Sequence, residues 1–308
     1  MGGIPPPEVV PGPRRARDAL RVKHPSAGPG DFERRLERAR SIEAADAAAQ
    51  PLAFLVRVLT HQLRRSAEPA VREAAARTAE DALPNRLVQQ YPLLDLTSAA
   101  APIAGETQAA VEELGDAAPG PLREAGLSLV ARSEMEQREL VEAWLDDTSL
   151  LDPRLALWIR VTAGPILELA AARSEPPEKE EWTGLACPLC GDAPQCSVIV
   201  EESGAFLQGS PRYLVCGRCA GWWDFPRAKC PTCGEDDSRK ISPYAAEDWP
   251  WARIDVCEAC RGYIKTFDLR EKGAMKVVPL VDDVATLALD VWAHEQGLTR
   301  QGLSLAGV

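Results

Sequence analysis

Eight cysteines between residues 187 and 260 form four Cys-x2-Cys pairs, a spacing typical of metal-thiolate sites. All nine cysteines of the 308-residue chain lie in this stretch. Two such pairs can aim four sulfur atoms at one point, which makes the closed tetrahedral site that suits zinc or a single iron ion. The sequence therefore predicts two metal sites with eight ligands: Cys187, Cys190, Cys216, Cys219, Cys230, Cys233, Cys257 and Cys260.

Two of the pairs have the form Cys-Pro-x-Cys-Gly, at residues 187–191 and 230–234. The proline fixes φ after the first cysteine, and the glycine supplies the positive φ that closes the turn around a metal. Loops of about 25 and about 23 residues separate the first pair from the second and the third from the fourth, as expected around a structural metal. Sequential pairing is the simplest arrangement, and interleaved pairing of the first pair with the third stays open.

Other uses of the cysteines fit this pattern less well. Residues 1–12 are rich in proline and glycine and contain no apolar signal segment, so we expect a cytoplasmic protein without disulfides. A thioredoxin-like redox site would have one pair beside a βαβ pattern instead of four pairs in tandem. A metal that only holds the fold is the main alternative to a metal with a further role. Cys196 belongs to no pair, and we expect it to be a small buried side chain.

Apolar periodicity predicts an all-α domain at residues 31–180, after an extended proline-rich arm at residues 1–30. Asp31 can cap the first helix, and Pro51 can open the second. The apolar stripes of these helices, expected to form a core separate from the metal region, are Phe32, Leu36 and Ala39, then Leu52, Leu55, Leu59 and Leu63. Further helices are predicted at 67–83, 107–115, 121–131, 134–146 and 153–172, separated by turns that include Pro84-Asn85 and Pro102. Pro165 should kink or divide the last helix.

Strand signals replace helical ones after a polar linker at residues 173–182, whose Trp182 should pack on the first ribbon. We interpret residues 181–275 as tandem β-ribbon modules, at about 185–225 and 226–270, in which the metals replace much of the missing aliphatic core. Trp222 and Trp223 are adjacent, so they should point to opposite faces of a strand and leave one ring exposed.

A C-terminal helix and tail are predicted at residues 276–308. Asp282 and Asp283 lie where carboxylates favour a helix N-terminus. The apolar face of this helix should consist of Val284, Leu287, Ala288 and Val291, and Gly297 should end it.

Charge and motif content argue against several function classes. The formal net charge is −11, and residues 187–270 hold ten Lys and Arg against twelve Asp and Glu, which argues against phosphate binding and so against nucleic acid. No run of 18 apolar residues exists, so we expect no membrane span. The sequence has no nucleophile elbow, P-loop or dinucleotide fingerprint, and its three histidines, His24, His61 and His294, are expected to be surface or capping residues. Closed four-cysteine sites leave no open metal position, so we expect no enzyme activity and no small-molecule substrate.

The metal region and the end of the chain resemble a known family, the formate dehydrogenase accessory (formation) proteins of FdhE type. The resemblance rests on the two Cys-Pro-x-Cys-Gly turns, on Arg212–Cys219, on the Cys-Glu-Ala-Cys-Arg-Gly-Tyr-Ile-Lys segment at 257–265 and on Val281–Asp290. It covers roughly residues 185–295, and Cys196, the arm and the Gly302–Leu305 tail depart from the family pattern.

The resemblance implies an α+β multidomain fold: an all-α helical domain, two tandem rubredoxin-like or zinc-ribbon modules, and a C-terminal helix. It implies two mononuclear iron sites, with zinc as the alternative metal. It also implies a cytoplasmic accessory factor that binds the catalytic subunit of respiratory formate dehydrogenase during its maturation. The alternative functions are a rubredoxin-like electron carrier and a nucleic-acid-binding zinc-ribbon protein.

Overall fold

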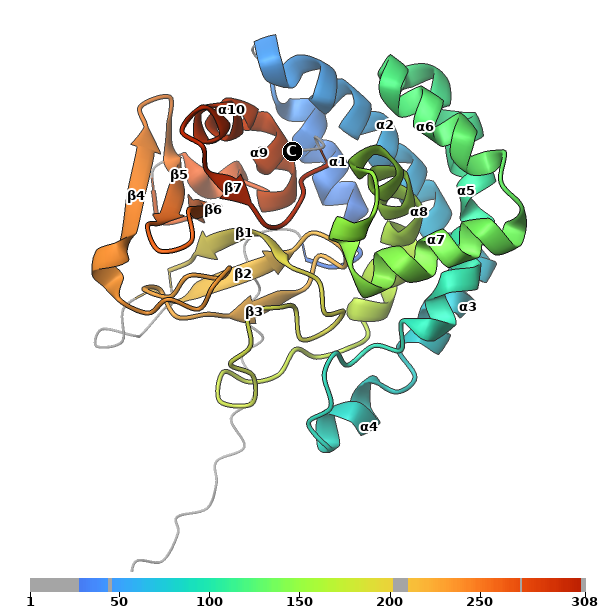
Figure 1. Cartoon of the computed structure of the whole chain (residues 1–308), viewed down its shortest axis with the longest axis horizontal. Helices are drawn as coiled ribbons and strands as arrows, with labels where there is room; N and C mark the ends of the chain where they lie inside the picture. The colour runs from blue at the N-terminus through green and yellow to red at the C-terminus, as the bar shows by residue number, and fades with distance from the viewer. Residues whose placement is uncertain (1–27, 44–45, 202–209, 272, 306–308) are drawn as a thin grey trace, which may run out of the picture.

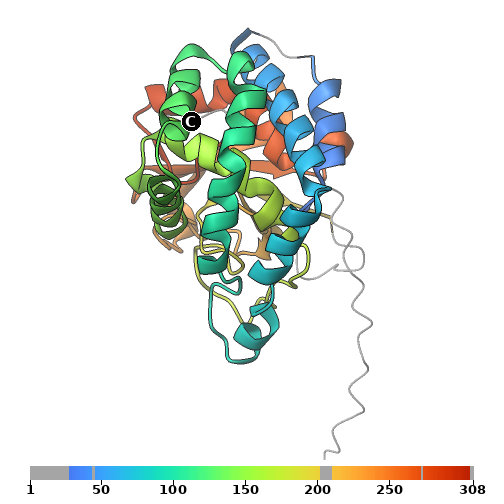
Figure 2. The ribbon, with the colours of Figure 1, turned by 90° about the vertical axis from the view of Figure 1, so that its right-hand side faces the viewer.

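A layer of helices packs against one face of a mixed β-sheet, and the C-terminal helices cover the other face (Figures 1 and 2). The structure is a computed structural model that describes residues 28–43, 46–201, 210–271 and 273–305. Most of the predicted arm at residues 1–30 lies outside these ranges, as does the end of the predicted tail. The predicted fold class, helices followed by a sheet-rich region with two four-cysteine groups, is confirmed.

The helical layer surrounds one central helix, α8, whose side chains are mostly buried and which contacts α2, α3, α5 and α6. Its members are α1 (Phe32–Ser41), α2 (Ala49–Ser66), α3 (Pro69–Thr78), α4 (Ala82–Leu87), α5 (Ala100–Leu114), α6 (Gly120–Val130), α7 (Glu134–Asp146) and α8 (Pro153–Ala171). The predicted stripes on α1 and α2 are buried, apart from Leu63, which is half-buried. Asp31 precedes α1 but makes no side-chain capping bond. Within the described residues, no helix is both long and apolar enough to cross a bilayer.

Pro165 does not divide α8, which runs unbroken from Pro153 to Ala171, so that part of the prediction is wrong. A proline at this position cannot donate to the carbonyl of Val161, four residues earlier. The side-chain amide of Gln62 on α2 takes that place, because its Nε2 donates to Val161 O at 3.0 Å. Gly164 permits this close approach, since a Cβ there would collide with the Gln62 amide. A neighbouring helix therefore supplies the bond that the proline removes.

Two predicted turns are wrong for a related reason. Pro84 and Asn85 lie inside α4, and Pro102 lies in the first turn of α5. The first backbone N–H groups of a helix have no partner within the helix, so proline is tolerated there. The chain instead breaks at residues 79–81, between α3 and α4.

The strands of both predicted ribbon modules join in one sheet of order β3-β2-β1-β6-β5-β4, with β7 paired to β6. Their bounds are β1 (Pro194–Ile199), β2 (Arg212–Cys216), β3 (Trp222–Asp224), β4 (Ile241–Ala246), β5 (Trp249–Cys257), β6 (Gly262–Asp268) and β7 (Thr299–Arg300). The seam between the modules is the parallel pair of β1 and β6, in which Cys196 lies opposite Lys265. The two cysteine-rich modules are therefore fixed to each other by backbone hydrogen bonds.

Both faces of this sheet are covered except at the outer strand β4, which is mostly exposed. Trp222 and Trp223 do point to opposite faces, but both are buried, so the predicted exposure of one ring is wrong. Trp223 joins the core of the helical layer, and Trp222 joins a core with the C-terminal segment. The expectation of a separate helical core is also wrong, because one cluster contains Trp158 of α8 together with Cys187 and Trp223. Trp182 lies against the ring of Tyr91, with centroids 4.6 Å apart, and its Nε1 donates to Ala186 O at 3.1 Å, just before the first cysteine.

The predicted C-terminal helix is two helices, α9 (Pro279–Ala285) and α10 (Leu287–Glu295), which meet at Thr286. The break changes the helical phase, so the predicted apolar face is wrong beyond it: Ala288 and Val291 are exposed, whereas Leu289 is buried. Helix α9 packs on α1 and α2. The C-terminal segment therefore contacts both the helical layer and the sheet.

A buried ion network fastens this segment to the β1–β6 seam. Lys265 Nζ lies 2.9 Å from Asp283 Oδ1 and 2.6 Å from Asp290 Oδ2. Arg300 pairs with the same two carboxylates at 2.8 Å, and Gln195 Nε2 on β1 donates to Asp283 Oδ2 at 2.6 Å. Burial alone would raise the pKa of Asp283, but Arg300 and Lys265 lower it to about 2. Two cations thus balance two anions where the modules meet.

Candidate metal centres

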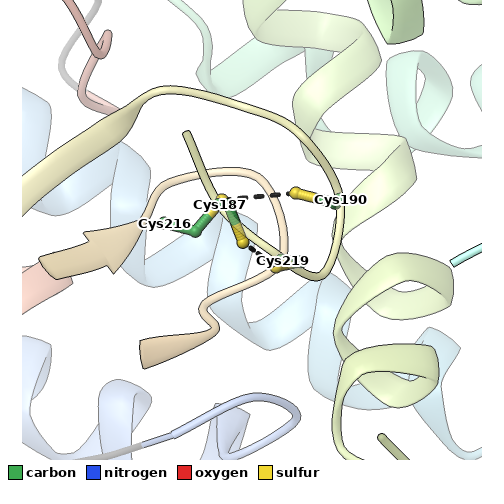
Figure 3. A group of neighbouring side chains, drawn as sticks. All are labelled: Cys187, Cys190, Cys216 and Cys219. Atoms are coloured by element: carbon green, nitrogen blue, oxygen red, sulfur yellow. Dashed lines mark hydrogen bonds between the residues drawn. The ribbon is translucent and has the colours of Figure 1, made fainter. Parts of the chain in front are cut away.

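Centre 1 consists of Cys187, Cys190, Cys216 and Cys219, whose four side chains are all buried. Figure 3 shows their sulfur atoms turned toward one another. The Sγ atoms of Cys187 and Cys219 are 3.7 Å apart, and those of Cys190 and Cys216 are 3.4 Å apart. The first pair lies in the loop before β1, and the second pair begins at the last residue of β2.

Centre 2 consists of Cys230, Cys233, Cys257 and Cys260. Two of its sulfur pairs, Cys230–Cys260 and Cys233–Cys257, are each 3.8 Å apart. Cys230 and Cys257 are buried and Cys260 is half-buried, but Cys233 is exposed. The structure therefore groups the four sequence pairs sequentially, first with second and third with fourth.

The sulfur separations fit a metal better than a disulfide. A metal–sulfur bond of about 2.3 Å in a tetrahedron places sulfur atoms about 3.8 Å apart, whereas a disulfide needs about 2 Å. In each centre the four ligand atoms lie within 4.8 Å of one another. Both four-cysteine groups could thus hold a metal ion, while ligation by these eight residues stays a prediction. Cys196 lies outside both groups and is fully buried on β1, as expected, and burial raises its pKa well above the ordinary value.

The turns around the centres explain the local sequence. Gly191 and Gly234 have φ values of 78° and 79°, which confirms the predicted role of glycine after the first pair of each centre. The second pairs close differently, because Ala220 and Arg261 take φ values of 54° and 60° without being glycine. Sequence reasoning missed these two strained positions. Backbone hydrogen bonds close both turns, from Cys216 N to Gly221 O and from Arg261 N to Cys257 O, and a turn fixed in this way can impose such backbone angles.

Backbone N–H groups in the turns point at the sulfur atoms. Arg218 N lies 3.3 Å from Cys216 Sγ in centre 1, and Gly262 N lies 3.3 Å from Cys260 Sγ in centre 2. Such bonds favour the thiolate form that a metal needs. Burial nevertheless raises the pKa of the Cys187 thiol well above its ordinary value and that of Cys260 to about 12. A metal binding here must therefore displace the protons of these two thiols, whereas the pKa of Cys190 is lowered despite its burial, because neighbouring thiols and Arg218 favour its thiolate.

Arg218 connects centre 1 to the helical layer. Its guanidinium is buried and donates to Trp144 O at 2.9 Å, to Leu145 O at 3.1 Å and to Cys190 O at 3.2 Å. It also lies over the Trp144 ring, 4.7 Å from the centroid. The first two acceptors are carbonyls at the C-terminal end of α7, where a cation is favoured. One side chain thus binds a helix end and the turn that holds two cysteines.

The backbone also joins centre 1 to the helical layer. Leu93 N donates to Pro188 O at 2.9 Å, and Leu94 N donates to Leu189 O at 3.0 Å. The two acceptors lie between the cysteines of the first pair. Centre 2 has a different setting: Glu258 N, in its second turn, donates to Lys240 O at the start of β4. These backbone bonds therefore anchor centre 1 to the loop between α4 and α5, whereas they anchor centre 2 to the residues that lead into β4.

Arg160 and the tail are further residues that sequence reasoning missed. Arg160 on α8 donates to the side-chain oxygen of Gln195 and to Leu303 O. Gly302 approaches β1 so closely that a Cβ would collide with Pro194 O. The available signal was a charged residue inside the mostly apolar stretch 155–167. Arg160 instead binds the tail to the strand that follows centre 1.

The histidines lie away from both cysteine groups where the structure describes them. His61 is buried rather than at the surface, and its Nδ1 is 2.7 Å from Glu113 Oε2. Burial lowers the pKa of His61. His294 is exposed, and His24 lies outside the described residues. Neither described histidine belongs to a potential metal-binding group.

Comparison with known protein families covers the region that carries both centres. Residues 186–227 match the model of the FdhE central domain, and residues 228–306 match that of the FdhE C-terminal domain. The match to the FdhE family therefore extends over residues 186–306. The border between the two family domains falls between centre 1 and centre 2.

Curated relatives agree with this assignment. An FdhE homologue from Aquifex aeolicus is 31% identical over 169 residues, which are 54% of this chain and 57% of the relative. One from Shewanella oneidensis is 37% identical over 111 residues, which are 36% of this chain and 34% of the relative. The match thus spans less than two thirds of either relative's length.

A solved structure matches most of the chain. The crystal structure of the FdhE protein from Pseudomonas aeruginosa aligns with a TM-score of 0.63 over 89% of this chain and 93% of that chain, at 21% sequence identity. At this identity the match shows a shared fold. It extends that fold beyond the family domains and into the helical layer.

Proposed function

We propose that this protein is an accessory factor for the maturation of respiratory formate dehydrogenase and that it binds the catalytic subunit of that enzyme in the cytoplasm. The observation that carries the proposal is the pair of four-cysteine centres within a region of the FdhE family. Each centre presents four sulfurs to one ion, so a bound metal has no open position for a substrate. A binding role fits these closed centres better than catalysis.

We propose one iron ion in each centre, held by the eight cysteines of centres 1 and 2. Four sulfur donors suit iron and zinc alike, and the resemblance to the formate dehydrogenase accessory proteins favours iron. A bound iron would supply one-electron chemistry, whereas zinc would only hold the fold. The visible spectrum separates the two metals, because ferric tetrathiolate is red and zinc tetrathiolate is colourless. Metal analysis should give two ions per chain on protein never exposed to a chelator.

The partner is tested by recovery of the catalytic subunit on the tagged chain from cells that make formate dehydrogenase. We expect recovery with the native chain and its loss in the double variant Cys257→Ser/Cys260→Ser. The change Ser238→Ala is a matched control, because it alters an exposed side chain of the same module. If the tagged native chain does not recover the catalytic subunit from cells in which formate dehydrogenase matures, the proposal is overturned.

An electron carrier is the second candidate, and the exposure of Cys233 in centre 2 favours it. A sulfur ligand at the surface gives an electron a short route to another protein. This function requires reversible one-electron reduction of the metal-loaded chain and transfer to a second protein, without recovery of the catalytic subunit. Neither Trp222 nor Trp223 offers an aromatic contact surface to a partner, since both rings are buried.

A further inference from the structure

An open groove of about 600 Å³ lies beside centre 1. Its walls come from three separate parts of the sequence: the loop at residues 92–97, the C-terminal half of α7, and the first turn of centre 1 at residues 190–191. The groove therefore exists only because the helical layer and the first cysteine turn pack together. Its volume lies in the range of about 300–1,000 Å³ that is typical of ligand-binding sites.

The groove combines apolar and acidic side chains. Pro92, Leu96 and Leu145 supply apolar surface, and the charged lining residues are Arg138, Glu142 and Asp146. Arg138 Nε is 2.8 Å from Glu142 Oε1, so that cation is already matched. No described residue forms an ion pair with Asp146, whose side chain is exposed. The lining therefore has one unmatched negative charge.

Two further features make the potential in the groove negative. The groove lies at the C-terminal end of α7, where the helix dipole is negative. Cys190 lines the groove and belongs to centre 1, where four thiolates and one divalent ion would carry a net charge of about −2. Arg218 opposes these charges, but it is buried and donates to carbonyl groups beneath the groove. An incoming cation is therefore attracted.

The exposed face of α7 next to the groove carries one further apolar side chain, that of Met135. Met135 lies three residues before Arg138, which places both on one face of the helix. Its side chain is 68% exposed, an unusual position for a large apolar side chain. A groove that is open to solvent and bordered by this exposed side chain suits a stretch of polypeptide better than a small molecule, which usually binds in an enclosed pocket.

We propose that this groove binds an extended segment of a partner protein in which arginine or lysine alternates with apolar residues. The apolar side chains would contact Pro92, Leu96 and Leu145, and a basic side chain would pair with Asp146. The proposal rests on the proposed function, because it assigns the surface through which an accessory factor holds its partner. Its test is independent, since it uses defined peptides instead of formate dehydrogenase.

The experiment measures the fluorescence anisotropy of short labelled peptides mixed with the full-length, metal-loaded chain. One peptide alternates leucine with arginine, and two others replace the arginines by glutamine or by glutamate. We expect saturable binding of the arginine peptide, weaker binding of the glutamine peptide and none of the glutamate peptide. Higher salt should weaken the binding, because the decisive charge is at the surface.

Asp146→Lys should weaken binding of the arginine peptide by about tenfold or more, because it replaces an attraction with a repulsion. Glu295→Lys is the matched control: it makes the same charge change at an exposed residue of α10, away from α7 and from the residues that line the groove. It should leave the affinity within about twofold of the native value, since exposed charges outside the contact are screened. Metal content and circular dichroism check that both variants fold.

Equal losses in the two variants would show a general charge effect and overturn the proposal. Binding that is insensitive to Asp146→Lys, or equal binding of all three peptides, would also overturn it. A second copy of this chain could instead occupy the groove. In that case no peptide would bind, and Asp146→Lys would change the molar mass measured by light scattering. This result would contradict the proposed partner segment. Peptide binding without recovery of the catalytic subunit would leave the groove assigned while the proposed function fails. Recovery of the subunit without peptide binding would support the proposed function and overturn the assignment of the groove.

Discussion

Centre 1 and centre 2 are built from the same pair of turns, but their surroundings differ. Centre 1 is enclosed between the sheet and the helical layer, and all four of its cysteines are buried. Backbone bonds to Leu93 and Leu94 and the guanidinium of Arg218 tie it to helical segments. Centre 2 lies toward the other end of the sheet, next to the outer strands β4 and β5, and exposes Cys233.

This difference indicates that the same pair of cysteine turns can stabilise either the whole fold or one module, depending on what packs around it. A metal that orders a turn also orders whatever that turn packs against. Around centre 1 this includes the shared core of helices and sheet. Around centre 2 it is chiefly the hairpin of β4 and β5. We therefore expect centre 1 to stabilise the complete fold and centre 2 to act locally and to exchange its metal more readily.

The largest effect should follow from Cys190→Ser, which removes a ligand from centre 1. We expect the free energy of unfolding to fall by about 5 kcal/mol or more, as for other losses of a buried metal site. The helices should melt at a lower temperature in far-UV circular dichroism, because their core continues into centre 1. Cys260→Ser is the matched variant in centre 2, and it should change helix melting much less. If Cys190→Ser leaves helix melting unchanged, the two parts have independent cores and the comparison fails.

Lys265→Met should cost about 4 kcal/mol, because it leaves two buried carboxylates with Arg300 as their remaining cation. Since the network joins Gln195 on β1 to β6, the change should loosen the seam between the modules. Denaturant unfolding measures the effect. Lys240→Met removes an exposed lysine near centre 2 and should give no measurable change. Equal stabilities of the two variants would mean that the network does not hold the seam.

Arg218→Met should cost about 3 kcal/mol, since it leaves the carbonyls of Trp144 and Leu145 buried without their donor. Arg239→Met is the counterpart near centre 2, where the guanidinium is exposed and pairs with Asp237. That change should leave the unfolding curve unaltered. The two variants are compared by thermal unfolding, which is followed both by the absorbance of the metal–thiolate centres and by the far-UV circular dichroism of the helices. A loss confined to the metal signal in Arg218→Met would contradict a link between centre 1 and the helices.

Sequence alone predicted the elements whose signals are local. The cysteine spacing identified both centres, and the glycines after Cys190 and Cys233 have the positive φ that the turn requires. The stripe of Phe32, Leu36 and Ala39 is buried as its spacing indicated. In each case the local structure is determined by residues that are close together in the sequence.

The features that sequence reasoning missed depend on distant residues. Strand β4 carries Pro243 and is mostly exposed, so no apolar alternation marked it. The helix through Pro165 survives because Gln62 supplies a hydrogen bond from another helix. The burial of Trp222 depends on a C-terminal segment that follows more than fifty residues later. An apolar stripe shows that a surface will be covered, but it does not show what covers it.

The most direct test of the difference between the centres is a timed chelator challenge of the full-length, metal-loaded chain. Metal content is followed together with alkylation of each cysteine by mass spectrometry. The account predicts two metals at the start and early loss of one, with alkylation of Cys230, Cys233, Cys257 and Cys260 while the cysteines of centre 1 stay protected. Simultaneous loss of both metals, or earlier alkylation of centre 1, would contradict it.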